Sequence, residues 1–254
     1  MIIQKIKKVL RPLYYILNNG KVVTIKGYRH LSKCIWLVDK KYGMAYFKGY
    51  YEPRLCQFLL KNLNKESVFV DVGSHAGYFG LFVASLVECG RVYSFEPEPY
   101  NFKFSKKIKE INDCQNWVLI NKAVADKVGV VNFNTNVSSS STGKIDECGA
   151  LEVDVTSLDV ELCGLNRLDI IKIDVEGFGG QVIIGAENTI RKFKPRLMIE
   201  IHSGTQELEV VLSRLGQIYL FYDLDTGEKV YHSNCSPSFL IGEPFKSTQL
   251  NGEC

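Results

Sequence analysis

The sequence predicts an α/β protein with a doubly wound, Rossmann-like parallel sheet. Val68–Val72 is a short, β-branched apolar run, as expected for a strand buried on both faces, and a glycine turn and an apolar helix at residues 78–86 follow it. Arg91–Phe95 is a second such run, and residues 100–111 form the next helical pattern. Strands that alternate with helices form parallel sheets, and their ligands bind beyond the carboxyl ends of the strands.

Short elements precede this unit. Apolar runs at residues 21–25, 35–38 and 44–47 predict strands of a small β-rich extension. Pro53, a residue favoured in the first turn of a helix, begins a helical pattern that ends at Asn64.

After the second strand the alternation continues. Further strands are predicted at Trp117–Ile120 and Ile170–Ile173 and at residues 128–133, 153–156 and 195–201. Helices are predicted at residues 158–162, 181–193 and 208–215. Residues 218–222 and 229–232 predict a C-terminal hairpin, and residues 239–241 predict a last edge strand.

Charge divides the chain into two parts. The protein has 254 residues and a net charge of +3, but residues 1–50 hold eleven Lys or Arg and one acid, Asp39. That part therefore carries +10 and the remainder −7. We divide the chain into an extension, residues 1–50, with an amphipathic helix and a β-rich part, and a doubly wound domain, residues 51–254.

The basic N-terminal helix has two interpretations. Residues 2–17 place their apolar side chains on one helical face and their lysines on the other. Such a helix could lie on an anionic membrane surface, or it could dock on the domain or on a partner protein, which we favour. We expect no nucleic-acid partner, because no aromatic residues interleave with the lysine runs.

The cysteines and the apolar runs bear on the compartment. The eight cysteines form no C-x-x-C motif and no zinc-ligand spacing, which indicates a reducing environment. No secretory leader or membrane-spanning run is evident. We expect a cytoplasmic protein that could associate peripherally with a membrane.

The glycine turn after the first strand predicts the cofactor. Its pattern, from Asp71 and Gly73 to Gly77, lacks the second glycine of the dinucleotide fingerprint, and a carboxylate would repel a pyrophosphate. S-adenosylmethionine suits Asp71 better, because it carries a sulfonium and an ammonium group. The turn, which includes Ser74 and His75, offers N–H groups to the carboxylate of the cofactor.

Glu96 ends the second strand. An acid at this place, about 20 residues after the glycine turn, accepts hydrogen bonds from both ribose hydroxyls in folds of this kind. A nicotinamide oxidoreductase is disfavoured by the glycine spacing.

Acidic residues and a histidine end two later strands. Asp174 and Glu176 follow Ile170–Ile173, and His202 ends the strand after it, so the three should converge near the glycine turn. His202 could be a general base for a hydroxyl, with Asp174 as a second base or as the residue that orients the acceptor. The three could instead hold a divalent metal, although we assign none, or they could be structural strand-end residues. Lys172 in the apolar strand needs a carboxylate partner.

The chain resembles the FkbM-like family of class I methyltransferases over residues 50–205. The shared motifs are Tyr51-Glu52-Pro53, Val70-Asp71-Val72-Gly73 with Gly77, Phe95-Glu96-Pro97, Asn121-Lys122-Ala123-Val124, Ser157-Leu158-Asp159, Ile171-Lys172-Ile173-Asp174-Val175-Glu176-Gly177, Gly185-Ala186 and Glu200-Ile201-His202. The N-terminal fifty residues show no such resemblance.

The resemblance implies a seven-stranded sheet and S-adenosylmethionine bound by Asp71, Gly73 and Glu96, and we add Ala123 to the cofactor-binding candidates. It also implies O-methylation, and we expect a sugar or glycan hydroxyl as the acceptor. A small metabolite, a protein side chain, or ligand binding with little turnover are the alternatives. One departure is Gly179-Gly180, where the family usually has an acid two residues after D-x-E-G.

Overall fold

The computed structural model describes residues 17–135, 143–145, 149–202, 204–232 and 237–245. The amphipathic helix predicted at residues 2–17 lies outside these residues except for Leu17. Within the described part, no helix has the length and apolar character needed to cross a membrane.

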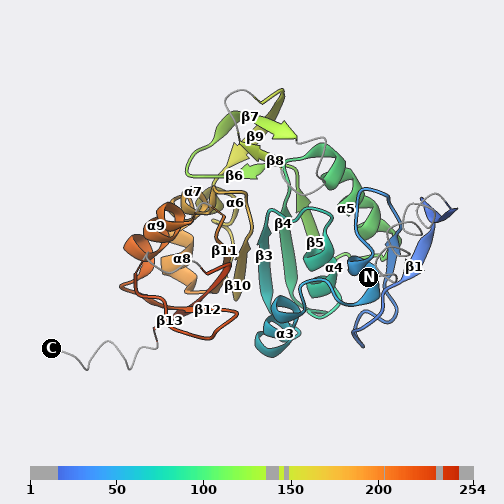
Figure 1. The fold of residues 1–254 in the computed structure, drawn as a ribbon, viewed down its shortest axis with the longest axis horizontal. Helices are drawn as coiled ribbons and strands as arrows, with labels where there is room; N and C mark the ends of the chain where they lie inside the picture. The colour runs from blue at the N-terminus through green and yellow to red at the C-terminus, as the bar shows by residue number, and fades with distance from the viewer. Residues whose placement is uncertain (1–16, 136–142, 146–148, 203, 233–236, 246–254) are drawn as a thin grey trace, which may run out of the picture.

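A seven-stranded sheet forms the centre of the molecule (Figure 1). Its order is β12-β13-β11-β10-β3-β4-β5. These strands are Tyr219–Asp223, Phe239–Pro244, Arg196–Glu200, Ile170–Ile173, Val68–Val72, Arg91–Phe95 and Trp117–Ile120. All neighbours are parallel except β13, which is antiparallel to both β11 and β12. The doubly wound fold is confirmed, and the chain order reverses direction beside β3, where ligands bind in such sheets.

Two hydrophobic cores cover the two faces of this sheet. Successive side chains of a strand point to opposite faces. Phe69 and Ile170 pack with the helices α3 (Pro53–Asn62), α4 (Tyr78–Ala84) and α5 (Pro99–Ile111). Val70 and Ile171, their neighbours in the chain, pack on the opposite face. Because both faces of these central strands are buried, their sequences are continuous apolar runs and do not alternate between apolar and polar residues.

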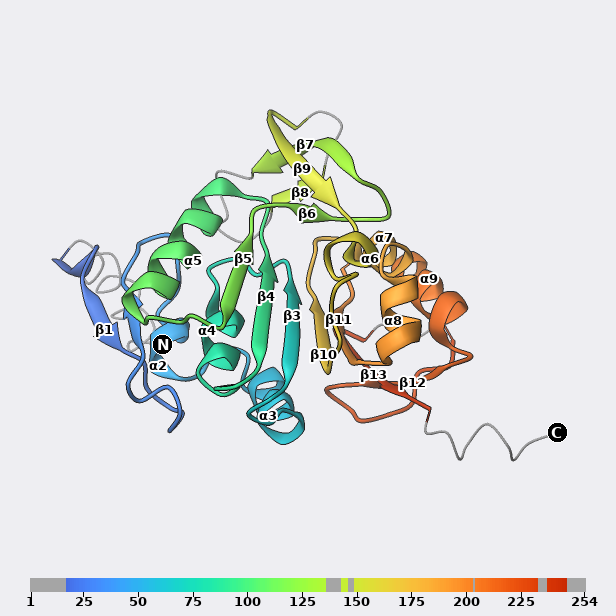
Figure 2. The same ribbon diagram turned by 180° about the vertical axis from the view of Figure 1, so that it is seen from behind.

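The second face is covered by the later helices α6 (Leu158–Glu161), α7 (Gly179–Ile184), α8 (Glu187–Phe193) and α9 (Thr205–Leu215). Figure 2, seen from behind, shows α8 and α9 on the side of β10 and β11, away from α4 and α5. The structure therefore has three layers, with the sheet in the middle.

The N-terminal part packs onto the first face. The strands predicted at residues 21–25 and 35–38 are present as β1 (Val22–Thr24) and β2 (Ile35–Leu37), and the two pair antiparallel. The prediction of a strand at residues 44–47 is wrong, because Ala45–Lys48 forms the helix α2, which Gly49 ends in a left-handed conformation. A four-residue apolar run fits either element, and Tyr46 and Phe47 are buried from a helix here.

Three predictions for the C-terminal half also differ from the structure. The helix predicted at residues 181–193 is two helices, because Gly185 lies against the Ala125 carbonyl and its own carbonyl accepts a hydrogen bond from the Asp159 N–H. The strand predicted at the edge, residues 239–241, belongs to β13, which inserts between β11 and β12. The chain turns back after β12 with an isolated antiparallel bridge between Tyr222 and Lys229, but residues 229–232 form no strand, and the strand that pairs with β12 is β13.

The cysteines of the described residues are unpaired. Cys34, Cys56, Cys89, Cys114 and Cys163 are free thiols. Only Cys56 among them is fully buried.

A four-stranded sheet with the order β6-β9-β7-β8 stands at the carboxyl ends of the central strands (Figures 1 and 2). Its strands are Ala123–Val124, Leu151–Thr156, Gly129–Thr135 and Gly143–Ile145. Because β6 follows directly on β5, this sheet forms one wall beside the ends of β4 and β5.

Candidate functional site

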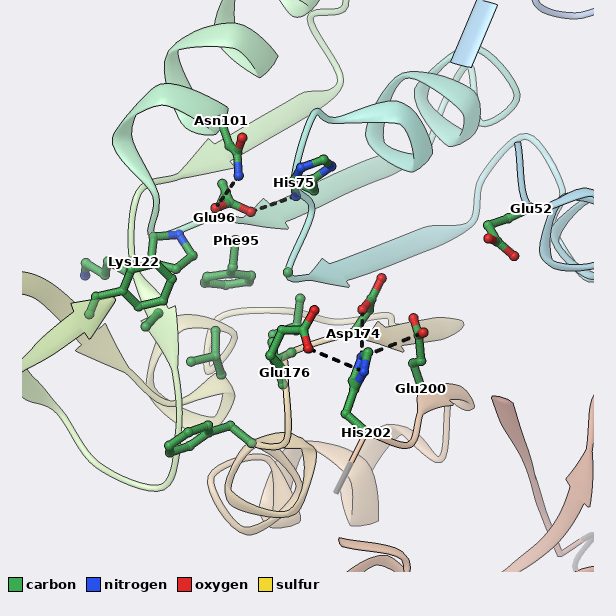
Figure 3. Close-up of a pocket in the computed structure, with 18 of the residues that line it drawn as sticks. Glu52, His75, Phe95, Glu96, Asn101, Lys122, Asp174, Glu176, Glu200 and His202 are labelled. Atoms are coloured by element: carbon green, nitrogen blue, oxygen red, sulfur yellow. Dashed lines mark hydrogen bonds and ion pairs between the residues drawn. The ribbon is translucent and has the colours of Figure 1, made fainter. Parts of the chain in front are cut away.

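A cavity of about 320 Å³ opens at the carboxyl ends of the central strands (Figure 3). This volume is in the range of small-molecule sites. The cavity is lined by seven of the predicted site residues, which are Gly73, His75, Glu96, Ala123, Asp174, Glu176 and His202. The other three, Asp71, Ser74 and Gly77, are not among its lining residues.

The turn after β3 is held in an unusual backbone conformation. Gly73 has φ of 79°, and a Cβ at this position would meet the carbonyl oxygen of Asp174. His75 has φ of 49°, which is uncommon for a residue other than glycine. The Gly73 N–H donates to the Phe95 carbonyl over 3.0 Å, so the turn is fixed to the end of β4. Strained backbone of this kind is concentrated at ligand sites.

Glu96 lies buried beside this turn, and Figure 3 shows its carboxylate directed toward His75 and Asn101. Its Oε2 accepts a hydrogen bond of 2.7 Å from the His75 N–H, and its Oε1 accepts one of 3.0 Å from the Glu98 N–H. Burial raises the pKa of Glu96 to about 7, although these hydrogen bonds oppose the rise. The carboxyl group of Glu96 therefore changes charge near neutral pH.

Asp71 lies near the end of β3, as predicted, but it is not among the residues that line the cavity. It is fully buried under the turn, and its Oδ1 accepts a hydrogen bond of 3.2 Å from Lys172 Nζ. The register explains the pair, because Asp71 and Lys172 are direct neighbours on β3 and β10 and point to the same face. A direct contact between Asp71 and the cofactor stays a prediction, while its partner in this structure is a lysine.

Lys172 joins the turn to the acidic cluster. Its Nζ also donates to Asp174 Oδ2 over 3.1 Å, so Lys172 has the carboxylate partners that its place in an apolar strand predicts. Burial opposes the charge of Lys172, but Asp174 and Asp71 raise its pKa above the usual value. Burial alone would raise the pKa of Asp174, but Lys172, His202 and Glu200 hold it well below its usual range.

His202 lies among three carboxylates (Figure 3). Its Nε2 is 3.3 Å from Asp174 Oδ1 and 3.8 Å from Glu200 Oε1, and its Nδ1 is 3.6 Å from Glu176 Oε2. The hydrogen bond to Asp174 raises the pKa of His202 to about 9, burial opposes the rise, and the charges of Glu200 and Glu176 add to it. The predicted convergence of Asp174, Glu176 and His202 is confirmed by these distances.

Sequence reasoning missed three kinds of cavity residue. Glu200 has the same orientation as His202, because residues two apart on a strand point to one face. Burial and the charge of Asp174 raise the pKa of Glu200 to about 8. Tyr46 and Tyr51 stack with ring centroids 4.2 Å apart, and Glu52 follows them with φ of 38°. The two-residue spacing was the signal for Glu200, whereas Tyr46 comes from the segment predicted as a strand.

The Gly179-Gly180 departure also has a structural explanation. A Cβ at Gly179 would collide with Glu207 Oε1, which comes from α9 and is buried. This carboxylate accepts hydrogen bonds of 2.8 Å from the Gly179 N–H and 2.9 Å from the His202 N–H. Glu207 therefore takes up the space beside residue 179 and fixes the start of α7 to the end of β11.

Comparison with known proteins identifies the family. The model of the methyltransferase FkbM domain matches residues 71–221, which is more than half of the chain. The chain belongs to the FkbM methyltransferase family. As a methyltransferase of this family, it takes S-adenosylmethionine as its cofactor, as the sequence predicts. No curated protein matches the sequence of this FkbM methyltransferase.

Solved structures resemble this FkbM methyltransferase at low identity. The methyltransferase FkbM from Methylobacillus flagellatus KT is 16% identical with a TM-score of 0.49, over 71% of this chain and 44% of that chain, so less than half of its length is matched. An rRNA methylase from Streptococcus thermophilus is 16% identical with a TM-score of 0.47, over 76% and 95%. A precorrin-6y C5,15-methyltransferase from Geobacter metallireducens GS-15 is 14% identical with a TM-score of 0.48, over 81% and 93%.

Proposed function

We propose that this FkbM methyltransferase methylates a hydroxyl group of a sugar or glycan. The observation that carries the proposal is a single cavity that has Gly73 and Glu96 on one side and the cluster around Asp174 and His202 on the other. A group transfer needs both reactants in one site at contact distance, and a cavity with two chemically different sides meets that need.

The first side fits the cofactor. Glu96 presents a carboxylate that can accept hydrogen bonds from two ribose hydroxyls. Gly73 contributes only backbone to the cavity wall, and Val124, Phe133 and Phe178 give an apolar wall suited to a flat base. S-adenosylmethionine supplies a methyl group on a positively charged sulfur. These residues would hold it so that the sulfur faces the acidic cluster.

The second side fits a polyhydroxylated acceptor. Asp174, Glu176 and Glu200 present carboxylate oxygens, which accept hydrogen bonds from hydroxyl groups. Tyr51, which stacks on the buried Tyr46, lines the same cavity and offers an aromatic ring to the C–H groups of a sugar. The combination of acceptors and aromatic faces supports a sugar more than a purely apolar metabolite.

His202 and Asp174 are the residues that we propose to act on the acceptor hydroxyl. Their hydrogen-bonded arrangement is one in which a carboxylate orients an imidazole. Because its pKa is about 9, His202 carries a proton in most molecules at neutral pH. We therefore propose that the pair binds and orients the hydroxyl, and that Asp174 or the neutral fraction of His202 accepts its proton.

The test is a turnover assay with the full chain, in which S-adenosylhomocysteine is measured for nucleotide sugars and glycans and for matched amino-sugar analogues. We expect a product methylated on oxygen. His202→Ala and Asp174→Asn should lower kcat by about 10²–10⁴-fold, the usual worth of a group that moves a proton in the transition state. Cofactor affinity should stay within about twofold in both.

The control is Glu209→Gln, which changes an exposed acid of α9 and should leave kcat unchanged. Methylation of the amino-sugar nitrogen alone would contradict the proposal and favour a cationic acceptor. Wild-type kcat in both His202→Ala and Asp174→Asn would remove the assigned role of this pair.

A further inference from the structure

Three atoms with the chemistry of metal ligands face one another in the acidic cluster. They are Asp174 Oδ1, Glu200 Oε1 and His202 Nε2, and the ligand atoms of these residues all lie within 4.8 Å of one another. Around an octahedral divalent cation with bonds of about 2.1 Å, neighbouring ligand atoms lie roughly 3 Å apart. The distances of 3.3 Å and 3.8 Å from His202 Nε2 to the two carboxylates are close to that spacing.

We propose that Asp174, Glu200 and His202 form a divalent-cation site that holds the acceptor hydroxyl in this methyltransferase. Two carboxylates with one imidazole suit a cation that accepts both oxygen and nitrogen ligands, such as Mn²⁺. Three protein ligands on one side leave coordination positions for water or for hydroxyl groups of the acceptor. The role in catalysis rests on the proposed function, whereas cation binding does not.

Asp174 and His202 each have a second polar atom that does not face the proposed cation, and a neighbouring side chain holds each of these atoms. Asp174 Oδ2 accepts a hydrogen bond from Lys172 Nζ, which leaves Oδ1 toward His202. Glu176 Oε2 lies 3.6 Å from His202 Nδ1, on the opposite side of the ring from Nε2. A carboxylate on the second ring nitrogen is the usual partner of a metal-bound histidine, because it fixes the tautomer whose lone pair faces the metal. Figure 3 shows His202 between Glu176 on one side and Asp174 and Glu200 on the other.

The backbone also holds the ligands in position. Glu207 accepts the N–H of His202 over 2.9 Å, and Asp174 follows β10 directly, with its N–H bonded to the Val72 carbonyl over 3.0 Å. Glu200 is the last residue of β11, the parallel neighbour of β10. Sites on strand ends of a rigid sheet hold ligand geometry better than sites on long loops.

Formal charge favours a cation at this place. The carboxyl groups of Asp71, Asp174, Glu176 and Glu200 outnumber the two basic groups of the cluster, Lys172 and His202. Lys172 is 2% exposed, whereas the side chains of Asp174, Glu200 and His202 are 28%, 29% and 22% exposed. The excess negative charge is therefore on the part of the cluster that an ion from solvent can reach.

A divalent cation here would serve the transfer in two ways. It lowers the pKa of a hydroxyl that binds to it, so that the hydroxyl proton can pass to solvent water without a free imidazole. It also fixes the hydroxyl oxygen between the cluster and the cofactor side of the cavity.

The test is calorimetric titration of the full chain with MnCl₂, without cofactor or acceptor. We expect one Mn²⁺ per chain. Glu200→Gln and His202→Ala should weaken its binding by more than about 100-fold, and Glu176→Gln by about 10–100-fold, as loss of an outer carboxylate does. Glu209→Gln should bind as the wild type does. Thermal melts of each variant show whether it is folded, and Glu200→Gln changes only one atom of the side chain.

A wild-type protein that binds Mn²⁺ no more tightly than Glu200→Gln would overturn this inference. The outcome is separable from that of the proposed function. If Mn²⁺ binds as expected and no hydroxyl acceptor is methylated, the cation site stands and the proposed acceptor is wrong. If Mn²⁺ does not bind and sugar methylation persists with a chelator, the acceptor stands and the cation site is wrong.

Discussion

Replacing Lys172 with methionine should destabilise the protein strongly, although the side chains are similar in length. Lys172 is 2% exposed, and its Nζ donates to Asp71 Oδ1 over 3.2 Å and to Asp174 Oδ2 over 3.1 Å. In Lys172→Met the Asp71 carboxylate, which is 0% exposed, would lose the one hydrogen-bond donor that it has among the described residues.

Two estimates of the magnitude agree. A hydrogen bond to a charged group contributes roughly 1.5–3 kcal/mol, and Lys172 makes two of them. Removing one partner of a buried ion pair costs about 3–5 kcal/mol, because the remaining charge is uncompensated. We therefore expect the free energy of unfolding to fall by about 3–5 kcal/mol and Tm to fall by roughly 6–20 °C for a chain of this size.

Urea denaturation of wild type, Lys172→Met and Lys106→Met measures this loss. Lys106 is an exposed lysine of α5, so its replacement should change stability by less than about 0.5 kcal/mol. The double variant Asp71→Asn with Lys172→Met should recover part of the loss, since it removes the uncompensated charge. If the free energy of unfolding falls by less than about 1 kcal/mol in Lys172→Met, the ion pairs of Lys172 with Asp71 and Asp174 do not stabilise the protein to the expected extent.

Three further changes test other parts of the site. Because the pKa of Glu96 is about 7 and its ionised form accepts the ribose hydroxyls, S-adenosylmethionine affinity measured by calorimetry should be constant above pH 8 and fall up to about tenfold per pH unit below pH 7. Glu96→Gln should abolish that dependence, and a pH-independent wild-type affinity would contradict the assignment. In Gly73→Ala the new Cβ would meet the Asp174 carbonyl. The free energy of unfolding measured in urea should therefore fall by more than the roughly 1–2 kcal/mol cost of an alanine in the left-handed conformation. A urea midpoint equal to that of the wild type would contradict this contact. Glu207→Ala should leave two N–H donors unpaired, including that of His202, and cost about 2–6 kcal/mol in the same assay, whereas unchanged stability would show that these hydrogen bonds contribute nothing.

The sequence predicts the centre of the fold well, because the residues there have one physical option. Val68–Val72, Arg91–Phe95, Trp117–Ile120 and Ile170–Ile173 have the predicted bounds as β3, β4, β5 and β10. Each is a short apolar run that both hydrophobic cores surround, and a helix of four or five residues could not fill that space.

The errors arise where distant contacts decide the local structure. The segment of Ala45–Lys48 is helical, and the adjoining backbone of Gly49 packs against Gly27, a contact that the short apolar run does not reveal. The break between α7 and α8 depends on the Ala125 carbonyl, 60 residues earlier in the chain, packed against Gly185. The position of β13 inside the sheet depends on pairing with β11, which local periodicity cannot show.

The site was predictable to a similar degree. Strand ends that meet at one edge of a parallel sheet bring Asp174, Glu176 and His202 together, as topology requires. The burial of Asp71 could not be predicted by the same reasoning, because its partner Lys172 is its neighbour only through the register of β3 and β10. Glu200 was overlooked although the strand alternation places it beside His202.

The most direct test is a crystal structure of the full chain with S-adenosylhomocysteine, the product form of the cofactor. We expect both ribose hydroxyls within about 3 Å of the Glu96 carboxylate, the usual distance of a hydrogen bond. The ligand carboxylate should lie on the turn at Gly73, with the sulfur directed toward Asp174 and His202. A ligand whose ribose is away from Glu96, or whose sulfur points away from Asp174 and His202, would contradict the arrangement on which the proposed transfer depends.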